Sequence, residues 1–390
     1  MREFEPGTPL LSRALPVRSE PYDPEQTRPY IEGLLPAGLR RRRIAEELGI
    51  GPEDDYGLIA ALGRDCPGAV TFLPAGSEPQ GAEPDLDWLE EDELAELLAA
   101  EPERLVDPED ERWMRFALPG ERHKLALLHD EAEDRWAWPT PQAPSTHVVK
   151  PEGEGRETHA ANELACSLAL RGMGFAVVHA EARTIAGRRC LISKRFDRWQ
   201  DSRRTARLHQ ESFAQATGCA AAELADRHEA RSCQEAAELL REVGESAGVE
   251  ALLVAAYAAF LLGDRGFRPE QDLALLHTEA GPLLAPLHGI ASQALDEDPT
   301  EPRPAAEAVR RNFAIAGLIP IGIGCGYEPQ PALELGIQTI GRLIEALGAV
   351  AERAYEEEDW YDPLIDEILQ RVIARYKSFG EEIELLGPED

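Results

Sequence analysis

Lysine is scarce in this chain of 390 residues, which contains only four lysines. Asp and Glu total 73 against 40 Lys and Arg, so the formal net charge at neutral pH is −33. Such an acidic chain repels phosphate backbones, which argues against DNA binding through a broad basic face. Two interpretations of the acidity stay open. The surface is either very soluble or salt-adapted, or it has an acidic face that docks a basic partner protein.

Paired cysteines are absent as well. None of the six cysteines forms a CxxC motif, which argues against a zinc ribbon and against a redox motif. In a cytoplasmic chain we expect them to be free and partly buried. They are Cys66, Cys166, Cys190, Cys219, Cys233 and Cys325.

Long apolar runs are also missing. The longest, residues 251–262 and 314–323, are too short to span a bilayer and are typical of buried elements. Residues 1–18 show no basic stretch followed by an apolar run, so we predict no signal peptide and a cytoplasmic protein. The length and the 43% hydrophobic content predict a globular chain with two or three lobes.

The pattern along the chain changes from strand-rich to helix-rich. We predict a short strand near residues 10–16 and a strand–turn–strand centred on residues 118–120. A sheet containing residues 148–150 is expected next to a helix over 158–172, and nearly everything beyond Leu208 is predicted to be helical. This layout is typical of a two-lobed α+β protein.

Four groups of segments, in a specific order and spacing, resemble the HipA kinases of toxin–antitoxin operons. They are residues 30–36 with 60–69, 116–127, 146–151 with 162–163 and 194–198, and 207–215. The resemblance implies a protein-kinase-like fold. Its parts would be a reduced N-terminal subdomain (1–110), a strand-rich nucleotide-binding lobe (111–207) and a mostly helical C-terminal lobe (208–390). Family members carry further strands before residue 10. Either this subdomain is reduced or a neighbouring chain supplies them.

Some positions that match the nucleotide site of the family are retained. Lys150 matches the strand lysine that pairs with phosphates, and Glu163 matches its helix partner. Gly120 and Lys124 lie in the stretch that matches the glycine loop, where a glycine lets backbone N–H groups approach a phosphate. We therefore expect these four residues around one cleft. The alternative for Lys150 and Glu163 is an ion pair that only holds the lobes together.

Two further residues are candidates for nucleotide binding. Phe196 ends the stretch 193–196 that would pass the adenine edge, and it is either an adenine platform or ordinary core. Arg268 falls on the histidine position of the family's catalytic loop and could neutralise phosphate charge.

The groups that the family uses for phosphoryl transfer are mostly replaced. The catalytic base falls on Gly266, the second metal aspartate on Gly289, and the autophosphorylated serine on Ala117. Glycine has no side-chain oxygen for magnesium, which prefers carboxylate and water ligands. Asp264 and Asp272 are the available substitutes for a base, and Asp272 also for a metal ligand.

Two functional classes follow. In the first, the chain is a catalytically impaired HipA-like protein that acts by binding an antitoxin-like or other regulatory protein. ATP is then an optional ligand, and a magnesium site is doubtful. In the second, it is an active serine/threonine kinase with rearranged carboxylates. Broad DNA binding and a membrane location are not expected.

Overall fold

The computed structural model describes residues 4–76, 86–100, 116–153, 157–200, 205–220, 223, 229–264, 267–292, 317–357 and 360–385. The chain forms two compact units that alternate along the sequence. The first contains Met1–Glu157, His179–Asp226 and Ala274–Ala285, and the second contains Thr158–Val178, Arg227–Leu273 and Pro286–Asp390. The lobe boundaries suggested by the sequence, at residues 110 and 207, stay predictions.

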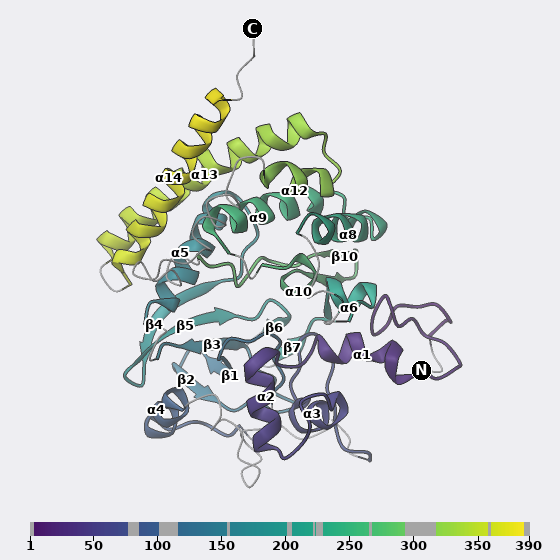
Figure 1. Ribbon diagram of the computed structural model, residues 1–390. Coiled ribbons are helices and arrows are strands. Elements are labelled where there is room, and N and C mark those ends of the chain that lie inside the picture. Colours follow the sequence, from purple (N-terminus) through teal and green to yellow (C-terminus); the bar gives the residue numbers. More distant parts are fainter. Residues whose placement is uncertain are drawn as a thin grey trace. The chain divides into compact units, whose positions relative to one another are not determined.

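The first unit is built on an antiparallel sheet (Figure 1). Among the described residues, five strands pair in the order β2-β1-β3-β5-β4. β-Branched residues favour extended backbone here, as Val148 and Val149 do in the run His147–Pro151. The strands are β1 (Leu125–Asp130), β2 (Arg135–Ala137), β3 (His147–Pro151), β4 (Ala180–Ile185) and β5 (Arg188–Lys194).

Four helices of the first unit precede the sheet in the sequence. Helix α1 begins at a capping box in which Asp23 accepts from the Gln26 N–H, and Pro24 occupies its first turn. Tyr30, Leu34 and Leu58 are completely or almost completely buried in the small core that the first three helices share. The helices are α1 (Pro24–Glu32), α2 (Gly38–Glu47), α3 (Asp55–Leu62) and α4 (Glu91–Ala99).

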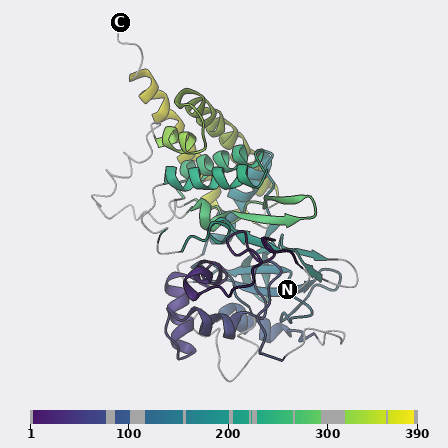
Figure 2. The ribbon, with the colours of Figure 1, turned by 90° about the vertical axis from the view of Figure 1, so that its right-hand side faces the viewer.

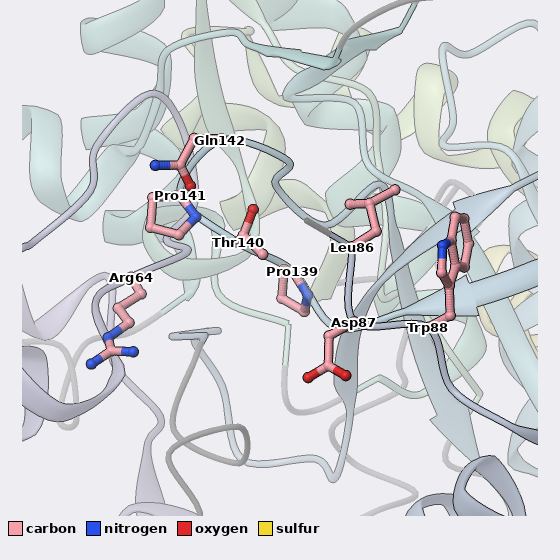
Figure 3. Close-up of a pocket in the computed structure, with 8 residues that line it drawn as sticks. All are labelled: Arg64, Leu86, Asp87, Trp88, Pro139, Thr140, Pro141 and Gln142. Atoms are coloured by element: carbon pink, nitrogen blue, oxygen red, sulfur yellow. The ribbon is translucent and has the colours of Figure 1, made fainter. Parts of the chain in front are cut away.

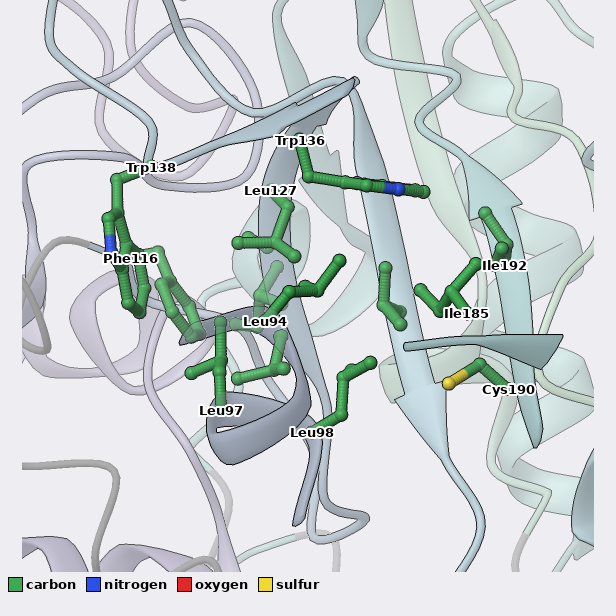
Figure 4. Close-up of a cluster of buried hydrophobic side chains, with 14 residues drawn as sticks. Leu94, Leu97, Leu98, Phe116, Leu127, Trp136, Trp138, Ile185, Cys190 and Ile192 are labelled. Carbon is green, nitrogen blue, oxygen red and sulfur yellow. The ribbon is translucent and has the colours of Figure 1, made fainter. Parts of the chain in front are cut away.

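Helix α4 covers one face of the sheet. Figure 4 shows Leu94, Leu97 and Leu98 of this helix pointing toward the strands. Their cluster includes Trp136 and Ile192 from the strands. Burial of such side chains contributes about 1.5–3 kcal/mol each, which fixes α4 on the sheet.

The described residues of the first unit also form two smaller sheets and the short helix α6. Figure 2 shows β9 and β10 side by side as a hairpin, and β8 pairs with the other edge of β9. These elements are β6 (Arg198–Gln200), β7 (Thr205–Arg207), β8 (Gln210–Ser212), α6 (Phe213–Thr217), β9 (Ala274–Thr278) and β10 (Gly281–Leu284).

The second unit is helical among its described residues. Helix α9 is apolar on every side and almost entirely buried, as expected of a central helix. It ends at Gly263, whose φ of +75° suits a left-handed C-cap. The helices are α5 (His159–Gly172), α8 (Glu229–Glu242), α9 (Gly248–Leu262), α10 (Pro269–Asp272), α12 (Leu318–Gly324), α13 (Pro329–Glu356) and α14 (Pro363–Leu385).

The structure confirms the α+β class, the strand at residues 148–150 and the helix that follows it. Three local predictions are wrong. Residues 10–16 form no strand, because Ser12 and Arg13 bond to the Glu211 carboxylate instead of to a neighbouring strand. The turn between β1 and β2 covers residues 131–134 rather than 118–120. Finally, β8, β9 and β10 interrupt the stretch beyond Leu208.

None of the six cysteines forms a disulfide, as expected, and all six are buried rather than only partly buried. None of the described helices combines the length and apolar character that crossing a bilayer requires.

Candidate functional site

The predicted glycine loop joins the N-terminal helices to the sheet. Gly120 has a φ of +91°, which favours glycine, and its carbonyl accepts from the Ala37 N–H at 3.2 Å. Lys124 Nζ donates to the Pro119 carbonyl, and a Cβ added at Gly120 would lie 3.0 Å from that nitrogen. The structure therefore brings Gly120 and Lys124 together, with the Lys124 ammonium folded back onto the loop.

Ala117, at the position of the family's autophosphorylated serine, is fully buried. Its N–H donates to the Asp65 carbonyl at 2.9 Å. The residue is therefore part of the packed core of the N-terminal helices and presents no surface to a nucleotide.

Lys150 lies on β3 and is half-buried. In the sheet it pairs with Leu191 of β5, while its neighbour Val149 pairs with Leu125 of β1. Lys124 lies directly before β1, and the β1–β3 register begins at the next residue, Leu125.

The segment predicted to pass the adenine edge serves a structural purpose that sequence reasoning missed. Arg195, Asp197 and Arg198 are buried on both sides of half-buried Phe196. The Arg195 guanidinium donates to Asp197 Oδ2 at 2.7 Å, and the Arg198 guanidinium donates to Asp65 Oδ1 at 3.0 Å. We call the following set the buried ion network: Asp65, Ser145, Arg195, Asp197, Arg198 and Arg207.

The two carboxylates of the buried ion network are charged despite their burial. Desolvation would raise the pKa of Asp65, but the charges of Arg198, Arg195 and Arg207 outweigh it and lower that pKa. The pKa of Asp197 is likewise lowered, because Arg195 and Arg198 together with the Gly68 N–H overcome desolvation. The sequence contained a sign of this network. Arg64-Asp65 and the run Arg195–Arg198 lie in segments that resemble the family, and each contains charged residues of both signs.

Glu163 lies in the second unit, on the buried face of α5. Its neighbour Asn162 makes a two-sided contact with Ser292: Asn162 Nδ2 donates to the Ser292 carbonyl at 2.6 Å, and the Ser292 N–H donates to Asn162 Oδ1 at 2.8 Å. Ser292 Oγ also donates to the Leu262 carbonyl at 2.9 Å. These bonds fix residues 290–292 against the end of α9.

Asp264 takes part in the same arrangement, since its Oδ2 accepts from the Ala291 N–H at 3.1 Å. We use the name Gly289 frame for the residues that hold the segment that follows Gly289. They are Asn162, Leu262, Asp264, Ala291 and Ser292. Gly289 itself has a φ of +75°, and a Cβ built there would meet no atom within 4 Å. The frame is thus complete, and there is space where the family's metal aspartate would stand.

Asp272 and Arg268 meet around the short helix α10. Asp272 Oδ2 accepts from the Arg268 N–H at 2.6 Å, a local capping contact. The Arg268 guanidinium donates to the Phe267 carbonyl at 3.0 Å. Gly266, the position of the catalytic base, lies outside the described residues.

The candidate residues therefore form separate local groups. Gly120, Lys124 and Lys150 belong to the first unit, whereas Glu163, Asp264, Arg268 and Asp272 belong to the second. A single cleft around all of them stays a prediction. In the described part of the chain, no three His, Cys, Asp or Glu side chains are grouped as a metal site requires, and Gly289 offers no ligand atom.

A cavity of about 570 Å³ lies within the first unit (Figure 3). None of the predicted site residues lines it.

Comparisons with known proteins agree with this architecture. Residues 2–73 match the HipA N-terminal domain, and residues 116–298 match the HipA-like C-terminal domain. The chain is 31% identical over 288 residues to a Sinorhizobium fredii protein named "Putative kinase Y4mE", covering 72% of this chain and 68% of that one. It is 28% identical to the serine/threonine-protein kinase toxin HipA of Shewanella oneidensis, over 48% of this chain and 42% of the toxin.

A solved structure shows the same fold. The HipA chain in a complex of Shewanella oneidensis HipA, HipB and operator DNA superposes with a TM-score of 0.70. The match covers 91% of this chain and 85% of that chain at 20% identity. Together with the two matching domains and the 31% identical relative, this establishes that the chain belongs to the HipA family.

Proposed function

We propose that this chain is a HipA-family protein of the cytoplasm that has lost magnesium-dependent phosphoryl transfer and acts by binding a regulatory protein. The observation that carries the proposal is Gly289 within its intact frame. Kinase-type transfer depends on metal ions that neutralise the phosphates and on a carboxylate that positions the nucleophile. Gly289 provides no oxygen at the metal position, although the surrounding hydrogen bonds hold its segment in place.

The substitute carboxylates already have structural tasks. One Asp264 oxygen binds the Ala291 N–H, and one Asp272 oxygen binds the Arg268 N–H. Moving either carboxylate toward a substrate would release a backbone donor, at a cost of about 1–3 kcal/mol if that donor stays buried. This favours a local structural task over catalysis for both residues.

A nucleotide could still bind without being turned over. Lys150 on β3 and Lys124 directly before β1 supply positive charge in the first unit, and Arg268 supplies it near α10. Binding through these cations alone would depend little on magnesium, because no carboxylate pair bridges a metal to the phosphates. ATP is accordingly proposed as an optional ligand.

The proposed partner is an antitoxin-like or other regulatory protein. The solved relative forms a complex with HipB and operator DNA. The net charge of −33 opposes direct contact with a phosphate backbone and favours a partner with a basic surface.

The proposal is tested by incubating the chain with labelled ATP, magnesium and candidate protein substrates. We expect no transfer above background, and nucleotide affinity that changes less than about threefold when magnesium is added. Label transfer that disappears in Lys150→Ala would refute the proposal in favour of an active kinase. Asp264→Ala and Asp272→Ala would then identify the carboxylate that had taken over.

A gain-of-function variant sharpens the test. Gly289→Asp places a carboxylate in open space, and the left-handed backbone costs about 1–2 kcal/mol, less for Asp than for bulky residues. We expect this variant to bind nucleotide more tightly with magnesium than without it. Gly289→Ala is the matched control, since it has the same backbone strain but no ligand atom.

A further inference from the structure

The cavity in the first unit has walls of mixed chemistry. It is lined by one cation (Arg64), one anion (Asp87), the Trp88 indole and two proline rings. Its volume of about 570 Å³ lies within the range of small-molecule sites, about 300–1,000 Å³. The remaining lining residues are Leu86, Thr140 and Gln142.

One wall is a turn fixed at both ends. The Thr140 N–H donates to the Ala143 carbonyl at 2.9 Å, and the Ala143 N–H donates to Thr140 Oγ1 at 2.9 Å. The Arg207 guanidinium donates to the Pro141 carbonyl at 2.8 Å and to Asp65 of the buried ion network. The turn is therefore attached to the core of the unit.

The opposite wall is attached to the sheet. Trp88 forms a β-bridge with Ala137, and the Trp138 N–H donates to the Asp87 carbonyl at 3.0 Å. The Arg135 guanidinium lies over the Trp88 ring at 4.0 Å from its centroid. Because hydrogen bonds hold both walls, the cavity is largely preformed, which lowers the entropic cost of binding.

The two charged residues lie on different sides of the cavity. Figure 3 shows Pro139, Thr140 and Pro141 between Arg64 on one side and Asp87 and Trp88 on the other. A guanidinium favours a carboxylate, and a carboxylate favours an ammonium group. Indole and proline rings between them favour an apolar body, and the Thr140 hydroxyl and Gln142 amide can bond to peptide groups.

We propose that this cavity binds a short free peptide, with its C-terminal carboxylate on Arg64, its N-terminal ammonium on Asp87 and an apolar side chain against Trp88. A phosphorylated ligand fits less well, because Asp87 would repel it and, of the described residues that line the cavity, only Arg64 is a cation. The proposal is independent of the kinase-type site, since none of the residues predicted for that site lines the cavity.

The experiment is a calorimetric titration of the full chain with the tripeptide Ala-Leu-Ala. We expect binding that weakens at least about tenfold when the peptide is N-acetylated, and again when it is C-amidated, because each change removes a charge-assisted hydrogen bond. Free leucine should bind more weakly than the tripeptide, since it has no peptide group to bond to Thr140 and Gln142. The proposal is overturned if the free peptide gives no heat of binding at millimolar concentration, or if the free, N-acetylated and C-amidated peptides bind equally well.

Two variants assign the ends of the peptide. The Asp87→Asn variant should bind the free and the N-acetylated peptide equally well, but should still bind the free peptide more tightly than the C-amidated one. The Arg64→Gln variant should bind the free and the C-amidated peptide equally well, but should still bind the free peptide more tightly than the N-acetylated one. The control is Arg28→Gln, which changes a half-exposed arginine paired with Asp55 away from the cavity and should behave like the unaltered chain. If Arg64→Gln does not fold, Asp87→Asn with the two blocked peptides decides alone. Discrimination that Asp87→Asn leaves unchanged contradicts the assignment.

Discussion

The buried ion network of the first unit and the Gly289 frame of the second differ in how their groups are satisfied. In the network, the buried carboxylates of Asp65 and Asp197 are paired with three arginines. In the frame, hydrogen bonds between Asn162 and Ser292 hold the segment after Gly289, and the Cβ position of Gly289 is open. The comparison indicates that side-chain charge is needed for packing in the network, whereas the frame is held without a side chain at position 289.

The physical basis of this contrast is the cost of an unpaired buried charge. Removing one member of a buried pair leaves the other without water or a partner, which destabilises a protein by about 3–5 kcal/mol. A side chain that stands in open space has no buried partner, so its loss costs little stability. Position 289 fits this description, since the Cβ position of Gly289 is open.

The largest expected effect is therefore in the network. Asp65→Ala removes the carboxylate that pairs with Arg198 and Arg207, and we expect a loss of about 3–5 kcal/mol in the free energy of unfolding. Urea unfolding followed by near-ultraviolet circular dichroism measures it. Glu133→Ala is the matched control. It breaks the exposed Arg135–Glu133 pair and should change the unfolding free energy by no more than about 1 kcal/mol. Equal urea midpoints for the two variants would contradict the role given to the network.

The second prediction concerns His147 in the first unit, whose pKa is changed more by burial than by neighbouring charges. Burial, followed by the charge of His129, lowers the pKa of His147 to about 4. Its Nδ1 lies 2.8 Å from Thr146 Oγ1, and the charged or titratable groups that face it are His129, Glu131, His179 and Lys194.

The sign of the pH effect follows from that lowered pKa. Because the folded-state pKa of His147 lies below the ordinary 6.5, its contribution to stability is complete above pH 6.5 and is lost as the pH falls toward 4. Relative to His147→Gln, the unaltered chain should lose up to about 3 kcal/mol of unfolding free energy over this range. Unfolding curves at several pH values test this. Parallel curves for the two proteins would show that His147 does not titrate as stated.

The smallest effect is expected in the Gly289 frame. Asn162→Ala breaks the two-sided contact with Ser292 and should cost about 1–3 kcal/mol. The amides of Ala291 and Ser292 should exchange faster with solvent, while amides of the sheet in the first unit stay protected. Hydrogen–deuterium exchange measures both regions at once. Unchanged protection at residues 290–292 would show that Asn162 does not hold this segment.

Part of this architecture was predictable from local sequence. The strand at residues 148–150 and the helix over 158–172 were expected from periodicity and are present as β3 and α5. The glycine at 289 and the retained Lys150 were also visible, because the flanking segments fix the alignment to the family. The short strand predicted at residues 10–16 failed because a distant side chain, Glu211, satisfies that backbone.

The sequence by itself predicted the family and the α+β class, because both depend on local patterns and residue identities. Only the tertiary structure shows how the charged residues of the buried ion network pair with one another. Asp65 is separated from Arg198 by more than a hundred residues, and no local rule brings them to 3.0 Å. The cavity between Arg64 and Trp88 likewise depends on a turn held by Arg207, since long-range contacts alone place these walls.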